Sequence, residues 1–202
     1  MRGECRRWRL FAAGIVCTAL GIALVTQAGR GTSAVASPAY VLSQIFPWSM
    51  GAFTVCINLG MMALQALLMG RAFFPRQLLQ LPASLVFGVL LDMFCHLLSP
   101  LRVPWFCLAL GCCVLGLGVG LQRLGGVLLL PSEGAVLAVS RRLRLDFGRV
   151  KVGFDVALVA AAAVLSWIFL GYVTGIREGT LVVAALTGPI SRGFYEWLHR
   201  FA

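Results

Sequence analysis

The sequence predicts an all-α transmembrane protein, a six-helix bundle built from two inverted three-helix repeats, each with a short interfacial or re-entrant helix. Composition, six long apolar runs and a faint internal repeat support this prediction. Of 202 residues, 60% are hydrophobic and 12% charged, and mean hydropathy is +0.92. A soluble domain could not cover so apolar a core, whereas a bilayer accepts helices that satisfy their own backbone groups. We expect one membrane domain over residues 1–202.

The net charge of +10 does not indicate nucleic-acid binding. The basic residues fall in clusters between apolar runs instead of lining one face of a soluble scaffold, and that distribution is typical of topology signals.

The first apolar run, about 9–28, begins like a signal peptide, because Arg6, Arg7 and Arg9 precede its apolar residues from Leu10 onward. It is long enough to cross a membrane and other runs follow it, so we expect an uncleaved first helix. At about 1.5 Å per residue, each run can cross roughly 30 Å of hydrocarbon. The further runs lie at about 50–70, 77–98, 103–122, 150–173 and 180–199.

Two shorter segments, about 33–46 and 132–143, are not long enough to cross. They are either interfacial helices or half-helices that re-enter the membrane where protein buries them. Both interpretations remain open from the sequence.

The distribution of Lys and Arg predicts that both termini are cytoplasmic in a multi-pass protein of the bacterial inner membrane. With six crossings, thirteen basic residues fall inside and three outside, with Arg192 within the last span. The outer three are Arg30, Arg102 and Arg177, and the inner ones are Arg2, Arg6, Arg7, Arg9, Arg71, Arg76, Arg123, Arg141, Arg142, Arg144, Arg149, Lys151 and Arg200.

The chain resembles itself at an offset of 97 residues, without gaps over positions 21–68. This register places Gly51 on Gly148 and Asn58 on Asp155, and an offset of 100 then places Gly88 on Gly188. The predicted repeats cover about 9–98 and 103–199. Because each contains three crossings, the second must be inverted, an architecture that places binding sites near the midplane.

Several motifs support a family assignment: GRxFFPRQLLQLPASLVFG from Gly70 with Asp92 after it, PSEG at 131–134, FGRVKVGFD at 147–155 and GIREGT at 175–180. Together they resemble the YczE-like family of bacterial integral membrane proteins, related more loosely to YitT, over roughly 10–195. The resemblance implies a polytopic inner-membrane protein and no particular substrate.

Four polar residues within the spans are candidate substrate or ion ligands: Asn58, Asp92, Asp155 and Arg192. An ionisable residue inside a span costs about 2.5–3.5 kcal/mol on insertion scales, so each needs a partner. We predict a direct or water-bridged contact between Asp155 and Arg192, and a parallel contact between Asn58 and Asp92 on the outer side. Such pairs are either a transport site or structural links between helices.

Four further candidates lie near predicted span ends. Arg177, Glu178 and Thr180 precede the last span, where Thr180 is a candidate N-cap and the free amides suit an anion, although a satisfied turn is the simpler interpretation. Glu133 follows Pro131 and begins the short segment, where it either favours the helix dipole or binds an ion or substrate.

No catalytic motif is present, so we expect no enzyme activity and no cofactor. Most of the seven cysteines lie in apolar runs and act as small hydrophobes. A metal or disulfide among Cys95, His96 and Cys107 is the less favoured alternative, and we predict no metal site.

These features favour a small secondary transporter or permease for an unidentified small-molecule or ion substrate. The alternative is a non-transporting accessory protein, either the substrate-binding subunit of a larger transporter or a helper of membrane biogenesis. A carrier needs a polar cavity between the repeats, whereas an accessory protein presents an apolar face to a partner. The lipid bilayer is the expected environment, no nucleic acid is expected, and a homo-oligomer or membrane partner is left open.

Overall fold

The computed structural model describes residues 2–70, 75–101 and 103–200, and all regular structure among them is helical. Arg71 and Arg102, which the charge count includes, lie outside the described residues. The helices are α1 (Arg2–Gln27), α2 (Ser37–Ile45), α3 (Met50–Met69), the 3-10 helix η2 (Pro75–Leu79), α4 (Gln80–Leu97), α5 (Pro104–Gly125), α6 (Pro131–Leu143), α7 (Phe147–Leu170) and α8 (Glu178–His199).

Each of the six apolar runs forms a long helix, and both shorter segments form helices as predicted. The shorter ones, α2 and α6, have 9 and 13 residues and are not long enough to cross a bilayer. Both are partly buried against other helices, since four of the nine residues of α2 and seven of the thirteen of α6 are buried.

Within the part of the chain that the structure describes, five helices are long and apolar enough to cross a membrane: α1, α3, α4 with its preceding turn, α5 and α7. The sixth predicted crossing, α8, is not among them. With 22 residues it has the length, but Arg192 and Glu196 lower its mean hydropathy.

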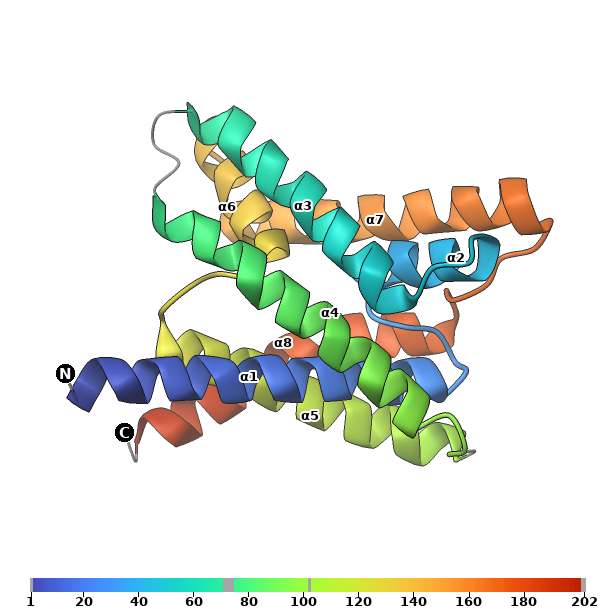
Figure 1. Ribbon diagram of the computed structural model, residues 1–202, viewed down its shortest axis with the longest axis horizontal. Coiled ribbons are helices and arrows are strands. Elements are labelled where there is room, and N and C mark those ends of the chain that lie inside the picture. The colour runs from blue at the N-terminus through green and yellow to red at the C-terminus, as the bar shows by residue number, and fades with distance from the viewer. Residues whose placement is uncertain (1, 71–74, 102, 201–202) are drawn as a thin grey trace.

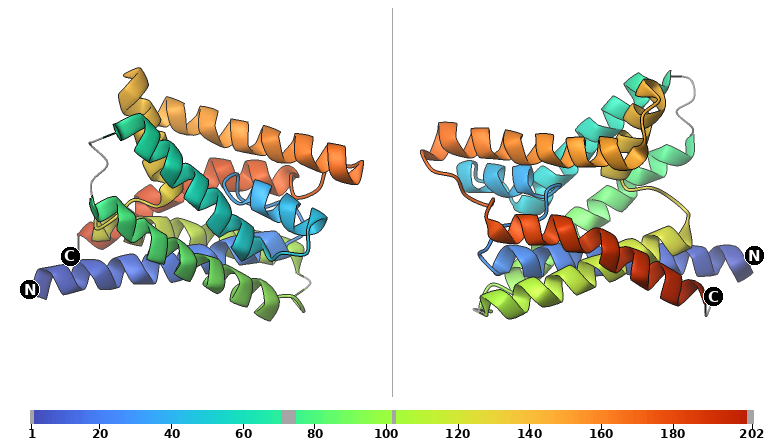
Figure 2. Two further views of the ribbon diagram at one scale, coloured as in Figure 1. Left: turned by 45° about the horizontal axis from the view of Figure 1, so that its top comes forward. Right: turned by 180° about the vertical axis from the view of Figure 1, so that it is seen from behind.

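Successive long helices run in alternate directions between two ends of the molecule (Figure 1). Both termini lie at one end, which we call the terminal end, and residues 98–101 and 171–177 lie at the opposite, distal end. The two further views show the same alternation (Figure 2).

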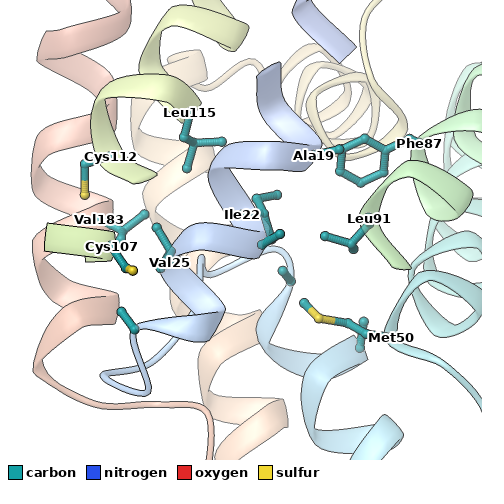
Figure 3. Packing of buried hydrophobic residues seen from close by; sticks show 14 of the residues in the cluster. Ala19, Ile22, Val25, Met50, Phe87, Leu91, Cys107, Cys112, Leu115 and Val183 are labelled. Atoms are coloured by element: carbon teal, nitrogen blue, oxygen red, sulfur yellow. The ribbon is translucent and has the colours of Figure 1, made fainter. Parts of the chain in front are cut away.

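The main apolar core surrounds α1. Figure 3 shows Val25 facing Cys107 and Val183, while Ile22 lies toward Leu91. All of these side chains are buried. The core therefore joins α1 to α5 and α8 on one side and to α4 on the other, and no residue of α7 belongs to it.

Glycines allow α1 and α5 to approach closely as an antiparallel pair. A Cβ atom on Gly14 would lie 2.8 Å from the carbonyl oxygen of Gly118, and one on Gly111 would lie 3.1 Å from that of Gly21. Such distances leave no room for a side chain, so the two backbones are in contact.

The other helices pack in matching pairs across the two halves. Helix α4 packs on α1 as α8 packs on α5, and the short helices α2 and α6 pack against α7 and α3 of the opposite half. Each short helix also contacts the long helix that follows it. The exception is that α3 packs against α4, whereas no comparable packing joins α7 to α8.

Candidate functional site

Asp92 on α4 holds the N-terminus of α3. Its carboxylate accepts hydrogen bonds from the amide of Gly51, at 2.7 Å, and from the hydroxyl of Ser49, at 2.5 Å. Ser49 is also the N-cap of α3 and accepts from the amide of Ala52. A carboxylate at this position is favoured by the helix dipole, so Asp92 links the two helices near the distal end.

The predicted contact between Asn58 and Asp92 is wrong. Asn58 is buried on α3, two turns beyond Gly51, while Asp92 is bonded to the first turn of that helix. The free amides and positive dipole of a helix N-terminus attract a carboxylate more strongly than a neutral amide side chain does.

The predicted contact between Asp155 and Arg192 is also wrong. Asp155 instead accepts a hydrogen bond from Lys151, one turn earlier on α7, at 2.6 Å. Arg192 is exposed on α8, which does not pack against α7. A partner four residues away on the same helix needs no tertiary contact, so the lysine satisfies the carboxylate first.

The candidates around residue 178 form a polar junction at the distal end. Glu178 accepts a hydrogen bond from Arg30 at 2.7 Å, and that bond lowers the pKa of its carboxyl group. The Arg30 guanidinium also lies 4.6 Å above the ring of Trp105, a cation–π distance. The link between α1 and α2 is thus tied to the start of α8.

Thr180 is not the N-cap of α8 as predicted. That position belongs to Arg177, and the buried Thr180 is the third helical residue, whose hydroxyl accepts from the Arg177 amide at 3.5 Å. Arg177 also donates to the carbonyl oxygen of Gly29 at 3.3 Å. The amides of Arg177, Gly179 and Thr180 are therefore satisfied within the chain, which favours the structural interpretation of this segment.

A cavity of about 450 Å³ lies at the terminal end, between α5, α6 and α8. Glu133 and Arg123 line it together with Gln122 and Tyr195, so the cavity contains both signs of charge and two neutral polar groups. Of the candidate residues, Glu133 is the one that reaches this cavity. The remaining lining residues are Gly126, Val127, Leu128 and Leu129.

A second cavity, of about 240 Å³, lies at the distal end and includes Arg177. Three of its lining residues lie 97 positions before lining residues of the first cavity, namely Thr26 before Arg123, Gly29 before Gly126 and Gly31 before Leu128. The two cavities thus share one corresponding edge, formed by the ends of α1 and α5 and the segments that follow them, while their other lining residues do not correspond. The remaining lining residues are Tyr40, Tyr172, Val173, Thr174 and Gly175.

Two buried glutamines also link helices, although the sequence analysis did not select them. The Gln65 side chain donates to the carbonyl oxygen of Pro131 at 2.9 Å and to the Gln80 side chain at 3.2 Å. This cluster holds α3, α4 and the start of α6 together. The sequence does contain an indication of this role, because the side-chain amides of both glutamines interrupt apolar runs as that of Asn58 does.

The seven cysteines are free thiols, including the half-buried Cys95 and the buried Cys107. Among residues 2–70, 75–101 and 103–200, no three His, Cys, Asp or Glu side chains are arranged to hold a metal ion.

The chain matches the family of unknown function DUF6198 over residues 5–196, and it therefore belongs to that family. No curated protein and no solved structure matches it. The resemblance to the YczE-like family stays a prediction, since this match does not test it.

Proposed function

We propose that this DUF6198 member is a small secondary transporter or permease, built as six crossings in two inverted repeats. The contact between α1 and α5 carries the proposal. Adding 97 to Gly14 and subtracting 97 from Gly118 converts that pair into Gly111 and Gly21, which is the other close backbone contact between the helices. The same exchange converts the contact of Gly21 with Leu115 into that of Gly118 with Thr18.

Such an exchange supports a twofold axis between α1 and α5, perpendicular to both. Because these helices are antiparallel and each is apolar enough to cross a membrane, the axis lies in the membrane plane. The matching helix pairs around them support the same relation. In this arrangement α8 is the sixth crossing, as the counterpart of α4, and it contributes Tyr195 to the cavity.

The cavity at the terminal end is the proposed entrance for solute, and its lining residues all belong to the second repeat, whereas the smaller distal cavity is lined by both repeats. A carboxylate, a guanidinium and an amide in one cavity suit a small polar solute that carries both charges, and 450 Å³ is within the usual range for small-molecule sites. From the distribution of basic residues, the terminal end is cytoplasmic, in a bacterial inner membrane.

Binding can be tested by the thermal stabilisation of purified protein across a panel of amino acids, amines and organic acids. We expect a zwitterionic solute to raise the melting temperature, and Glu133→Gln or Arg123→Gln to abolish that rise. Arg141→Gln is the matched control, because Arg141 is exposed on α6 and does not line the cavity. A rise that survives both cavity substitutions would contradict this site.

An accessory role is the second candidate, and α7 is the observation that favours it. Only Ala162 and Ser166 of its 24 residues are buried, while large side chains such as Trp167, Ile168 and Phe169 are exposed. Lipid or a partner helix would cover this face. Co-purification of a stoichiometric membrane partner, with binding but no transport by the chain alone, would favour the accessory role.

A further inference from the structure

We propose that the junctions α3–α4 and α7–α8 are alternating gates, and that the structure shows the first closed and the second open. The inference rests on the proposed inverted repeat and adds the residues at which access would change. It concerns two pairs of helices that occupy corresponding places in the two halves and differ in conformation.

The α3–α4 junction is closed by direct backbone contact. A Cβ atom on Gly88 would lie 2.9 Å from the carbonyl oxygen of Gly51 and 2.6 Å from a methyl group of Val55. One on Gly51 would overlap the carbonyl oxygen of Gly88. Asp92, bonded to Ser49 and Gly51, acts as a latch across this contact.

The corresponding glycines of the second half do not meet. Nothing lies within 4 Å of a Cβ atom built on Gly188, and only the Asp146 carboxylate lies near one built on Gly148. Asp146 takes the place of Ser49 as the N-cap, and it bonds the amides of its own helix instead of receiving a residue from α8.

The two helices of the open junction diverge from their connection toward the terminal end (Figure 2). Pro189 lies within α8, directly after Gly188. Proline removes a backbone hydrogen bond and permits a helix to bend, so α8 is able to bend at the position that corresponds to the contact of α4 with α3. Gly148 and Gly188 do not touch each other here, whereas their counterparts Gly51 and Gly88 do, so they are suited to a second conformation in which they touch.

In that second conformation Gly148 would pack on Gly188 at the terminal end, and Asp92 would release Ser49 and Gly51 at the distal end. Exchange of the two arrangements exposes the interior to opposite ends in turn, as alternating access requires. The structure therefore corresponds to the form that is closed at the distal end.

Hydrogen–deuterium exchange of the full chain in lipid nanodiscs tests this coupling without a substrate. Asp92→Asn should raise the exchange rate of the backbone amides in residues 50–55 by about tenfold, because a charged hydrogen bond is lost. The informative segment is 147–152, at the other end, where exchange should fall as α7 closes on α8. Faster exchange in residues 50–55 with unchanged exchange in residues 147–152 would show that Asp92 acts only as a cap of α3, and it would overturn the proposal.

A second variant covers the case in which Asp92→Asn does not fold. Gly188→Leu fits the present structure but prevents closure, so it should slow exchange at 50–55 several-fold. Gly193→Leu is the matched control, because it also meets open space on α8 and its repeat counterpart is Met93. Equal exchange in the two folded variants would contradict the gate. Reciprocal exchange without any measurable transport would contradict the proposed function and leave the gate standing.

Discussion

At the residue scale, the two acidic residues of the predicted pairs have different roles. Asp92 joins two helices through the start of α3, whereas Asp155 is bonded within its own helix to Lys151. Both sit in apolar runs, so the sequence marks them equally. Their partners depend on which helix ends meet in space, and the position of a residue within its apolar run does not contain that information.

These different roles predict different losses of stability. Asp92→Ala should lower the free energy of unfolding by about 1–3 kcal/mol, since it removes charged hydrogen bonds between elements. Asp155→Ala should change it by no more than about 0.5 kcal/mol, because the ion pair is within one helix and partly exposed. Melting temperatures of the purified variants measure the difference. A larger loss for Asp155→Ala would indicate a tertiary partner for that residue.

Glu178 should give the distal end a weak dependence on pH. Its bond to Arg30 lowers the carboxyl pKa in the folded chain, so the stabilisation is present above the ordinary glutamate pKa. It is lost as the pH falls through the lowered value. Comparison of melting temperatures between pH 3 and pH 7 should show a smaller acid-induced drop in Glu178→Gln. Equal drops in the two proteins would exclude this contribution.

At the element scale, the helix bounds were largely predictable and the packing was not. The near-spanning length of the apolar runs and the Pro or Gly residues at their ends predicted six long and two short helices. This was possible because, in an apolar solvent, each segment must satisfy its own backbone hydrogen bonds. Which faces touch depends on glycines spaced along α1 and α5. The 97-residue register was detected only from residue 21, yet the contacts extend it to Gly14 and Gly111.

The glycine contacts predict a sharp contrast between substitutions. Gly118→Ala should destabilise the chain by about 1–3 kcal/mol, since its Cβ atom would lie 2.6 Å from the backbone nitrogen of Thr18. Gly60→Ala should be neutral or slightly stabilising, because nothing lies within 4 Å of a Cβ atom there. Thermal unfolding of both variants in the same detergent provides the measurement. Equal stabilities would show that α1 and α5 do not meet at this register.

The candidate site was predictable in part, because some of its residues lie at helix starts that the sequence marks. Glu133 and Arg177 lie on cavities, as expected of charges beside a proline or glycine at a helix start. Tyr195 and Gln122 were not selected, because nothing in the sequence indicates that α5 and α8 enclose a common space with α6.

At the scale of the whole molecule, the number of crossings decides whether α8 spans the membrane or not. Six crossings place both termini on the same side, whereas five place them on opposite sides. We predict that reporters fused at residue 1 and residue 202 both read as cytoplasmic. A reporter after residue 149 should read the same, since that loop is the most basic. An external reading at residue 202 alone would remove α8 from the spans and the inverted repeat with it.

The central claim, that this chain transports solute by itself, is tested most directly by counterflow in liposomes that contain only the purified protein. Liposomes loaded with the solute that stabilises the protein should accumulate labelled solute from outside, while liposomes with Gly188→Leu should bind it and accumulate none. Counterflow absent from the wild type across the whole panel, with solute binding intact, would contradict transport and favour the accessory role.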